Sequence, residues 1–326
     1  MLDRLLARGF QRPHSAAADL YFTNAMSEEP GWRRLSSTVF ESDRAVLVVR
    51  NHLGVTLPRG KALMYLIDDD LAAAVRDPGL GAGYRARLAL VELRMARRLR
   101  ARAEQIVATS ELLQAKLASQ LGREVALMVP YWSERFATLD HFAPEAAPRI
   151  GFLGSLTHRG DLALVLEILR LILASRRDVE VVMAANHAIP SWLADHPGFR
   201  PIAATDWPGY RRALAELGCQ ICLHPLADTP LNRARSPNKL IEFGVAGTAA
   251  LYSETWPQSQ HVTPGLSGLV LPAEPQIWAD AVLDLLDDHA RAKLLASGGQ
   301  ELAQRLNDLA PQRRFWASAM GLSQPN

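Results

Sequence analysis

Short apolar runs alternate with longer segments of helical periodicity along most of the chain. This alternation is typical of a parallel sheet whose strands are connected by helices. Residues 1–42 do not share it, because Pro13, Pro30 and Gly31 interrupt any long pattern, so we expect an irregular N-terminal segment with short helices there. The runs that predict strands are residues 45–49, 62–67, 105–108 and 125–129, followed by 149–153, 179–184, 201–204, 220–223, 249–252 and 269–271.

The pattern breaks at residues 141–148, where two prolines and three alanines precede a new strand. We therefore expect two Rossmann-like, doubly wound α/β domains, residues 1–146 and 147–310, followed by a C-terminal tail at 311–326. The first domain should be short, with only about four strands. The second repeats the alternation more clearly and should be doubly wound, a fold in which ligands bind beyond the carboxyl ends of the strands.

One long helix is predicted at residues 84–104, with a single buried stripe of apolar side chains. The stripe consists of Leu88, Val91, Met95 and Leu99. The rest of this helix is rich in arginine, which fits either a solvated face or a peripheral contact with anionic lipid. A solvated face is favoured, because we expect the apolar stripe to pack in the core of the domain, and it includes no aromatic residue that could anchor the helix in a membrane. The arginines are Arg85, Arg87, Arg94, Arg97, Arg98, Arg100 and Arg102.

Composition narrows the function classes. The chain has 326 residues, 48% of them hydrophobic, which is enough for two ordinary cores. A net charge of +2, from 36 basic and 34 acidic side chains, argues against a nucleic-acid partner. Cys219 and Cys222 are the only cysteines. Their spacing suits redox or metal chemistry, but they lie in an apparent buried strand, so core packing is favoured.

No apolar stretch is long enough to span a membrane. The longest candidate, residues 162–174, contains Glu167 and Arg170. The first residues also lack the basic run and apolar core of a secretory leader. We therefore expect a cytoplasmic protein, with peripheral contact to the inner face of a membrane left open through the arginine-rich helix.

The first candidate site is the turn within residues 151–161, where a strand ends and a helix begins. Gly154 allows a ligand to approach the backbone, and a helix start presents unpaired N–H groups to an anion. His158 and Arg159 would add side-chain donors for a pyrophosphate. The alternative is an ordinary strand-to-helix turn in which Asp161 caps the helix.

The second candidate lies within residues 230–247, directly after a predicted strand. Ser236 fits a helix cap, with Pro237 at the first helical position, so the helix would begin in the same cleft. Lys239 and Glu242 are three residues apart and share a helix face, which suits a ligand with phosphate at one end and ribose hydroxyls at the other. The alternative is a surface ion pair worth only about 0.2–0.5 kcal/mol.

This segment resembles the donor-site signature of family 4-like glycosyltransferases. The similar positions extend back through the Gly154 turn and residues 219–225, and cover about residues 149–275. The resemblance implies a GT-B fold, in which two Rossmann-like domains face a cleft and the second holds most of the nucleotide. The motif reads Pro237-x-Lys239-x-x-Glu242-Phe243-x-x-x-Gly247, followed by a strand that ends in Ser253-Glu254.

The resemblance also implies roles for individual residues. Glu242 matches the second acidic residue of the family's paired-glutamate motif and would bond the donor ribose. Lys239 and Arg235 would stabilise the departing diphosphate, and the turn that ends at His158 would cover it from the other side. The remaining donor-side candidates are Gly154, Ser155, Arg159, Asn186, His224, Ser236 and Asn238.

The sequence departs from the family in one clear place. The first glutamate of the motif would lie eight positions before Glu242, where this chain has Ala234. The usual contact with the transferred sugar is therefore absent, which leaves the sugar unpredicted and favours, to a small extent, a non-catalytic relative.

A run of three carboxylates follows the second predicted strand. Asp68, Asp69 and Asp70 would suit a hard cation such as Mg²⁺, but aspartates also make good turn and cap residues. The resembling family needs no metal for catalysis, so no metal and no cofactor are expected. The three aspartates are kept as acceptor-side candidates.

These patterns lead to three hypotheses. The favoured one is a retaining glycosyltransferase that moves a sugar from a nucleoside diphosphate sugar to a glycan or lipid-linked acceptor, in bacterial surface polysaccharide synthesis. The second is a catalytically silent nucleotide-binding or partner-binding module of the same fold. A sugar-nucleotide epimerase is the weakest of the three.

Overall fold

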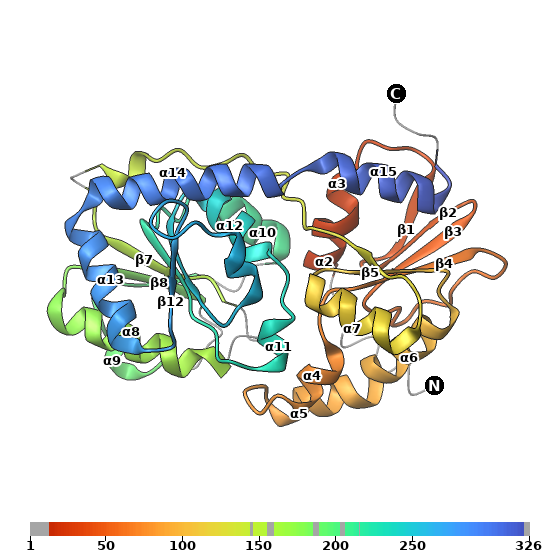
Figure 1. Cartoon of the computed structure of the whole chain (residues 1–326), viewed down its shortest axis with the longest axis horizontal. Helices are drawn as coiled ribbons and strands as arrows, with labels where there is room; N and C mark the ends of the chain where they lie inside the picture. The colour runs from red at the N-terminus through yellow and green to blue at the C-terminus, as the bar shows by residue number, and fades with distance from the viewer. Residues whose placement is uncertain are drawn as a thin grey trace.

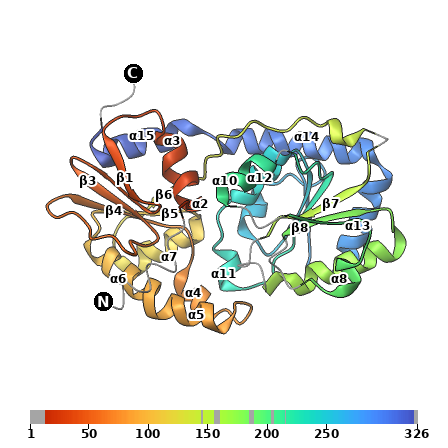
Figure 2. The same cartoon turned by 180° about the vertical axis from the view of Figure 1, so that it is seen from behind.

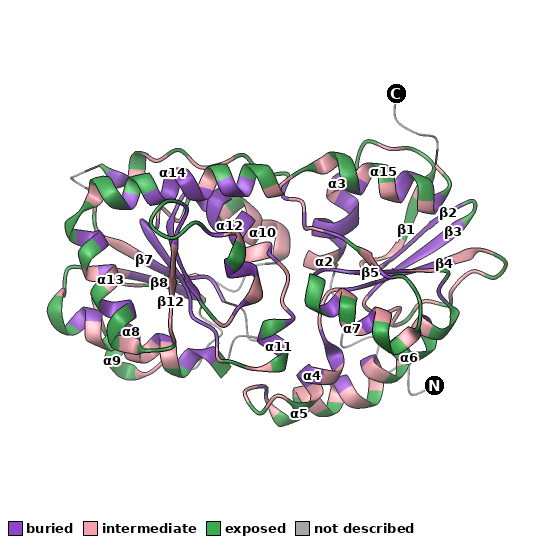
Figure 3. Cartoon of the chain, in the orientation of Figure 1, coloured by how far each residue is buried: buried purple, intermediate pink, exposed green. Residues whose placement is uncertain are grey.

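A computed structural model describes residues 13–143, 146–154, 160–184, 189–202, 206–214 and 216–322 of the chain. They form two halves, each built around a six-stranded sheet with helices against it (Figures 1 and 2). The central strands of each half are buried, and the outer helix faces are largely exposed (Figure 3).

The first sheet keeps the strands in sequence order. Its first three strands pair antiparallel, and the third to sixth pair parallel. The reversal of strand order that defines double winding is therefore absent from this sheet. The strands are β1 Trp32–Ser36, β2 Val39–Ser42, β3 Ala45–Val49, β4 Ala62–Ile67, β5 Gln105–Ala108 and β6 Ala126–Leu127.

The first two strands correct the prediction of an irregular segment and of about four strands in this half. Strand β1 reads Trp-Arg-Arg-Leu-Ser, with Arg33 and Arg34 exposed. It is an edge strand without the apolar run by which strands were recognised in the sequence. Trp32 holds it to the core, because its ring packs edge-on against Phe22 with centroids 5.0 Å apart.

Both faces of the first sheet are covered, because alternate strand residues enter different apolar clusters. Val46 and Val48 pack with the helices that follow β4 and β5, whereas Leu47 and Val49 pack with the N-terminal and C-terminal helices. The first group comprises α4 Leu71–Arg76, α5 Ala82–Arg87, η2 Leu88–Glu92, α6 Leu93–Arg102 and α7 Glu111–Leu121. The second comprises α2 Ala16–Ala18, η1 Asp19–Thr23, α3 Asn24–Met26 and α15 Leu309–Met320.

Helix α15 carries the end of the chain back onto the first half, as Figure 1 shows. Trp316 is fully buried there, and its Nε1 donates to the carbonyl oxygen of Tyr21 at 2.6 Å. Ser42 Oγ donates to the carbonyl oxygen of Met320 at 2.6 Å. Residues 311–320 of the expected tail are therefore part of a helix packed on the first half.

The predicted long helix is interrupted by a π-helical turn, η2, which contains one more residue per hydrogen-bonded ring than an α-helix. The turn changes which side chains face the core. Leu88 and Leu99 are buried as predicted, but Glu92 and Ala96 replace Val91 and Met95 in the buried stripe. The change of register brings a carboxylate into the interior.

The second sheet is fully parallel and doubly wound, in the order β12-β11-β10-β7-β8-β9. The strands are β7 Arg149–Phe152, β8 Glu180–Ala184, β9 Phe199–Ile202, β10 Ile221–His224, β11 Ala249–Ser253 and β12 Leu269–Leu271. Strand order reverses between β7 and β10, which is where a doubly wound sheet presents its binding crevice.

Helices pack on both faces of this sheet. They are α8 Leu162–Ser175, α9 Ser191–Ala194, α10 Trp207–Leu214, α11 Pro230–Arg233, α12 Asn238–Ala246, α13 Pro275–Asp287 and α14 His289–Leu306, with short 3-10 turns η3 Asp140–Phe142 and η5 Pro257–His261. Apolar faces of α8 and α13 share one cluster with Ile150 and Leu251, and α12 packs on the other face.

The two cysteines lie in the core of the second half. Both are buried, with Cys219 1% and Cys222 0% exposed. A side-chain carbon at Gly151 would come within 2.8 Å of the Cys222 sulfur, so the glycine makes room for the thiols. The hydrogen bond that the Cys219 thiol makes to Cys222, together with burial, raises the pKa of Cys219 well above its usual value. This environment supports packing over thiol chemistry.

Candidate functional site

Lys239 lies at the reversal point of the second sheet. Its Nζ donates to the carbonyl oxygen of Leu153, directly after β7, at 2.7 Å. The same ammonium lies 2.5 Å from Glu242 Oε1; the Glu242 side chain is buried, with 3% exposed, and the Lys239 side chain is partly buried, with 13% exposed. The pair is thus a buried ion pair at the sheet edge where ligands bind, and not the surface ion pair considered from sequence.

Three donors converge on the Glu242 carboxylate. Besides Lys239, Tyr210 OH donates to Oε1 at 2.5 Å, and Asn238 Nδ2 donates to Oε2 at 3.1 Å. Burial, followed by the charge of Glu242, raises the pKa of Tyr210 well above its ordinary value, so this hydroxyl stays protonated and donates. These three bonds satisfy lone pairs of a carboxylate that is buried at this depth.

Helix α12 positions these groups. It begins at Asn238, and its preceding residue, Pro237, makes no side-chain capping bond. The prediction that Ser236 caps this helix is therefore wrong. Helical spacing places Asn238 and Lys239 four and three residues before Glu242 on one face. Trp132 Nε1 donates to Asn238 Oδ1 at 2.8 Å and fixes the amide orientation.

Arg235 belongs to a second polar chain beside α12. Its Nε donates to Asn232 Oδ1 at 2.8 Å, and Asn232 Nδ2 donates to Asp161 Oδ1 at 2.9 Å. The Ala227 backbone N–H also donates to Asp161 Oδ1, at 2.8 Å. Asp161 makes no side-chain cap on α8, and burial raises its pKa. Asp161 thus joins β7 and β10 across the reversal point.

The other donor-side candidates are placed differently. His224 is 2% exposed, and its ring packs edge-on against Trp256 at 4.8 Å, so it is a core side chain and not part of the cleft wall. Gly154 follows β7 and is buried beside Leu153. Ser155, His158, Arg159 and Asn186 lie outside the described residues.

The two halves meet where the strands of both sheets end. Ser110, after β5, donates through Oγ to the Ala234 carbonyl oxygen at 2.7 Å. Ala234 is 2% exposed, so the first half covers the position where the family's first glutamate would lie. Gln258 Nε2 donates to Glu111 Oε2 at 2.7 Å, and Leu231 enters an apolar cluster of the first half.

Arg50 organises the carboxylates of the first half. Its guanidinium lies 2.8 Å from Asp69, 3.5 Å from Asp68 and 2.7 Å from Glu92. Arg50 adopts a left-handed backbone with φ of 63°, which a non-glycine residue holds only when its surroundings impose it. Glu92 also contacts Arg87, so its buried carboxylate is doubly paired.

The three aspartates have different environments. Asp70 caps α4, accepting from the Ala73 N–H at 3.0 Å, and contacts Lys116. Asp68 has an oxygen, Oδ1, that is buried without a hydrogen-bond partner among the described residues. Burial, opposed by Arg50, raises the pKa of Asp68 to about 6. Asp68 is therefore the aspartate with bonding capacity left for a ligand.

A tyrosine from the N-terminal segment connects Asp68 with the second half. Tyr21 is buried, and its hydroxyl lies among Ser236, Thr109 and Asp68. Burial raises its pKa far above the usual value, so it acts as a neutral hydroxyl. Ser236 thus lies at the boundary between the halves, and not at the head of α12.

No family profile matches the sequence, and no curated protein matches it. Solved structures do match. The sucrose-phosphate synthase of Thermosynechococcus elongatus gives a TM-score of 0.57 at 16% identity, over 79% of this chain and 69% of that one. Anabaena HepE in complex with UDP and glucose gives 0.56 at 14% identity, over 80% and 72%. S. aureus TarM gives 0.57 at 11% identity, over 80% and 51%.

The chain has the GT-B glycosyltransferase fold. The expected architecture of two α/β domains around a cleft is therefore confirmed. No helix in the described part of this GT-B chain is both long and apolar enough to cross a bilayer.

Sequence reasoning missed the groups that reach the site from distant segments. Tyr210, Trp132 and Arg50 all bond site residues, but no local motif connects them with Lys239 or the aspartates. The only available signal was the position of Arg50, a charged residue placed directly after a buried strand.

Proposed function

We propose that this chain is a glycosyltransferase that takes a sugar from a nucleoside diphosphate sugar and passes it to a glycan or lipid-linked acceptor. The observation that carries the proposal is the buried Lys239 and Glu242 pair at the reversal point of the second sheet, anchored on the Leu153 carbonyl. A uridine diphosphate donor is the first to test, because the Anabaena HepE structure contains UDP.

The site has the chemistry needed to hold such a donor. The Lys239 ammonium, now shared between Glu242 and a carbonyl oxygen, is placed to turn toward a diphosphate. The carboxylate would then accept from ribose hydroxyls, while Tyr210 and Asn238 keep it oriented. When the bond between the sugar and the diphosphate breaks, its electron pair leaves with the phosphate, and a nearby cation lowers the barrier.

On the acceptor side, Asp68 is the aspartate we retain. The charge of Asp68 acts on the Tyr21 hydroxyl at the boundary between the halves, and Thr109 Oγ1 donates to the backbone carbonyl oxygen of Asp68 at 3.2 Å, which leaves Asp68 Oδ1 without a hydrogen-bond partner among the described residues. We assign Asp70 to helix capping, because its two oxygens are engaged by the Ala73 N–H and by Lys116. The proposed setting is bacterial surface polysaccharide synthesis in the cytoplasm, with retention of configuration and no cofactor besides the donor.

A second candidate function is a nucleotide-binding module that transfers nothing. The specific observation in its favour is that Ala234, where the family's first glutamate would lie, is buried and its carbonyl oxygen accepts a hydrogen bond from Ser110 of the first half. A module of this kind would bind the nucleotide without turnover.

The first test is thermal stability with a panel of UDP-, GDP-, dTDP-, CDP- and ADP-sugars. A ligand at about 100 times its Kd stabilises a protein by about 2.7 kcal/mol, so binding of one nucleotide class should raise Tm clearly. The variant is the double change Lys239→Met with Glu242→Gln, which removes both buried charges together. The matched control is Arg233→Met, which breaks an exposed pair with Asp228.

Loss of the response in the double variant but not in the control supports the donor site. An unchanged response in the double variant contradicts it. Release of free nucleoside diphosphate that depends on an added acceptor then separates the transferase from the silent module.

A further inference from the structure

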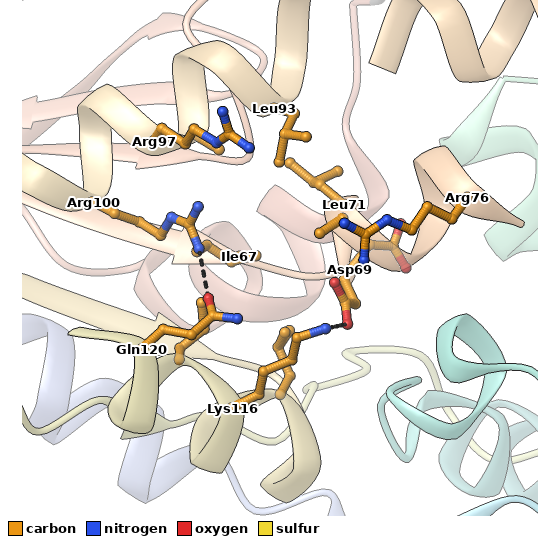
Figure 4. A pocket seen from close by; sticks show the side chains of 14 residues that line it. Ile67, Asp69, Leu71, Arg76, Leu93, Arg97, Arg100, Lys116 and Gln120 are labelled. Atoms are coloured by element: carbon orange, nitrogen blue, oxygen red, sulfur yellow. Dashed lines mark hydrogen bonds and ion pairs between the residues drawn. The ribbon is translucent and has the colours of Figure 1, made fainter. Parts of the chain in front are cut away.

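A hollow of about 310 Å³ lies on the first half between α4, α6 and α7, apart from Lys239 and Glu242 (Figure 4). Its volume is at the small end of the range for small-molecule sites. Apolar side chains form much of its wall, which suits the body of a ligand rather than bulk water. They are Ile67, Leu71, Leu93, Ala96, Leu113 and Leu117.

Four basic side chains enter this hollow from three helices. Arg76 comes from α4, Arg97 and Arg100 come from α6, and Lys116 comes from α7 (Figure 4). Four cations converging on one hollow would repel one another unless anions compensate them.

Carboxylates in the wall compensate only part of this charge. Asp70 contacts Lys116, and Asp69 lies 2.8 Å from Arg50, which is outside the hollow. Asp69 and Asp70 are therefore already matched by cations. Within the described part of the chain, three guanidinium groups of the hollow have no carboxylate partner.

These guanidinium groups have donors to spare. Arg76 and Arg97 make no ion pair among the described residues. Arg100 meets only the neutral Gln120 side chain, at 3.4 Å, and its Nε is buried without a partner in the described part of the chain. A buried donor without an acceptor costs free energy, and a bound anion would remove that cost.

We propose that this hollow binds a phosphate monoester or diphosphate group. Guanidinium groups present forked donors that match the oxygens of a phosphate, and several of them can share its charge. The apolar wall holds the adjoining part of the ligand. This assignment changes the interpretation of the arginine-rich helix, because Arg97 and Arg100 serve a binding site and not a general solvated face.

The test is calorimetric titration of the full chain with inorganic pyrophosphate. The variants are Arg97→Ala and Arg100→Ala, singly and together. The matched control is Arg98→Ala, an exposed arginine of the same helix that does not line the hollow. Loss of each guanidinium should weaken pyrophosphate binding roughly ten-fold, because each change removes charge-assisted hydrogen bonds to phosphate oxygens, while the control keeps the wild-type Kd.

Pyrophosphate can also bind at the proposed donor site, so the titration is repeated in the Lys239→Met, Glu242→Gln background. Binding that persists there and is lost with Arg97 and Arg100 supports the hollow. Binding that is lost there and is indifferent to Arg97 and Arg100 overturns this inference and leaves the proposed function intact.

Two sources of the phosphate are separated with vesicles. Cosedimentation with phosphatidylcholine vesicles that contain phosphatidic acid, whose headgroup is a phosphate monoester, but not with phosphatidylcholine alone, identifies a lipid headgroup if the arginine variants abolish it. Pyrophosphate binding without cosedimentation identifies a soluble phosphate ester. Absence of binding to both probes in the wild-type protein overturns the proposal.

Discussion

Both halves gather charged side chains where their strands end, but the balance of charge differs. In the second half, the Glu242 carboxylate has one cation, Lys239, and two neutral donors, Tyr210 and Asn238. In the first half, the guanidinium of Arg50 meets the carboxylates of Asp68, Asp69 and Glu92. The second cluster is neutral and fully bonded, whereas the first has surplus negative charge and an unpartnered oxygen on Asp68.

The difference predicts how each cluster responds to change. A neutral ion pair whose hydrogen bonds are satisfied needs no further partner. A ligand must therefore compete with the hydrogen bonds that the pair already makes within the protein. A cluster with surplus carboxylates depends on its one shared cation and gains from a proton or a hydroxyl donor. The first half is thus suited to meet acceptor hydroxyls and the second to meet a donor diphosphate, as the proposed function requires.

The largest effect should come from Arg50→Met. The change leaves Asp68, Asp69 and Glu92 close together, with Arg87 as the remaining cation on Glu92. Removing one partner of a buried ionic cluster typically costs about 3–5 kcal/mol, and we expect the upper part of that range. The free energy of unfolding from urea titration measures it. Arg170→Met, which breaks an exposed pair with Glu167, is the control and should cost less than about 1 kcal/mol.

The next effect should come from Lys239→Met, at about 3 kcal/mol, because Glu242 keeps Tyr210 and Asn238 but loses its cation. Adding Glu242→Gln should recover much of this loss, since no charge is then left buried. Urea titration of both variants checks the order. If the double variant is as unstable as the single one, the unpaired charge of Glu242 is not the cause of the stability lost in Lys239→Met.

The sequence was informative about the second cluster because its main contacts are local. Lys239 and Glu242 are three residues apart on one helix, so spacing alone places them together. The first cluster combines a residue that follows β3, residues that follow β4 and a residue of η2. These segments are far apart in the sequence, and only packing brings them together. Glu92 shows why the sequence was less informative here. Ordinary helical spacing predicts that Val91 faces the core, but the π-helical turn places Glu92 in the core instead.

The strands also differ in whether a local pattern in the sequence predicts them. Apolar runs such as residues 45–49 and 62–67 became strands with the predicted bounds, because buried strands need apolar side chains on both faces. The β1 strand could not be found by that criterion, since it is a polar edge strand held by Trp32. Residues 311–320 were assigned to a tail because helix packing onto a distant half leaves no local signal.

Protonation should distinguish Asp68 from the second cluster. Its pKa is raised from 3.8 to about 6 in the folded chain, so its charged form costs stability above about pH 6, and this cost disappears as pH falls toward 3.8. Asp68→Asn should therefore stabilise the protein by about 3 kcal/mol at neutral pH, since one pKa unit is worth about 1.4 kcal/mol. The gain should vanish in acid.

The measurement is urea titration of wild type and Asp68→Asn across this pH range, where shared acid effects cancel in the difference. Asp69→Asn is the matched control, because its carboxylate lies 2.8 Å from Arg50 and its loss should destabilise the protein at neutral pH. A constant difference between Asp68→Asn and wild type at all pH values would refute the assignment.

The smallest effect concerns the hydrogen bond between Ser110 and Ala234, which joins the two halves. Ser110 Oγ accepts from the Leu113 N–H as the cap of α7 and donates to the Ala234 carbonyl oxygen. Ser110→Ala removes both bonds and should cost about 1–2 kcal/mol. Ser110→Gly costs only a few tenths of a kcal/mol as a helix cap, so the remaining loss of stability in that variant isolates the contact between the halves.

If that contact holds the halves closed, small-angle scattering should show a larger radius of gyration for both variants than for wild type. An unchanged radius would mean that Leu231 and Gln258 keep the halves together without Ser110, and that the position of the missing glutamate stays covered by packing alone.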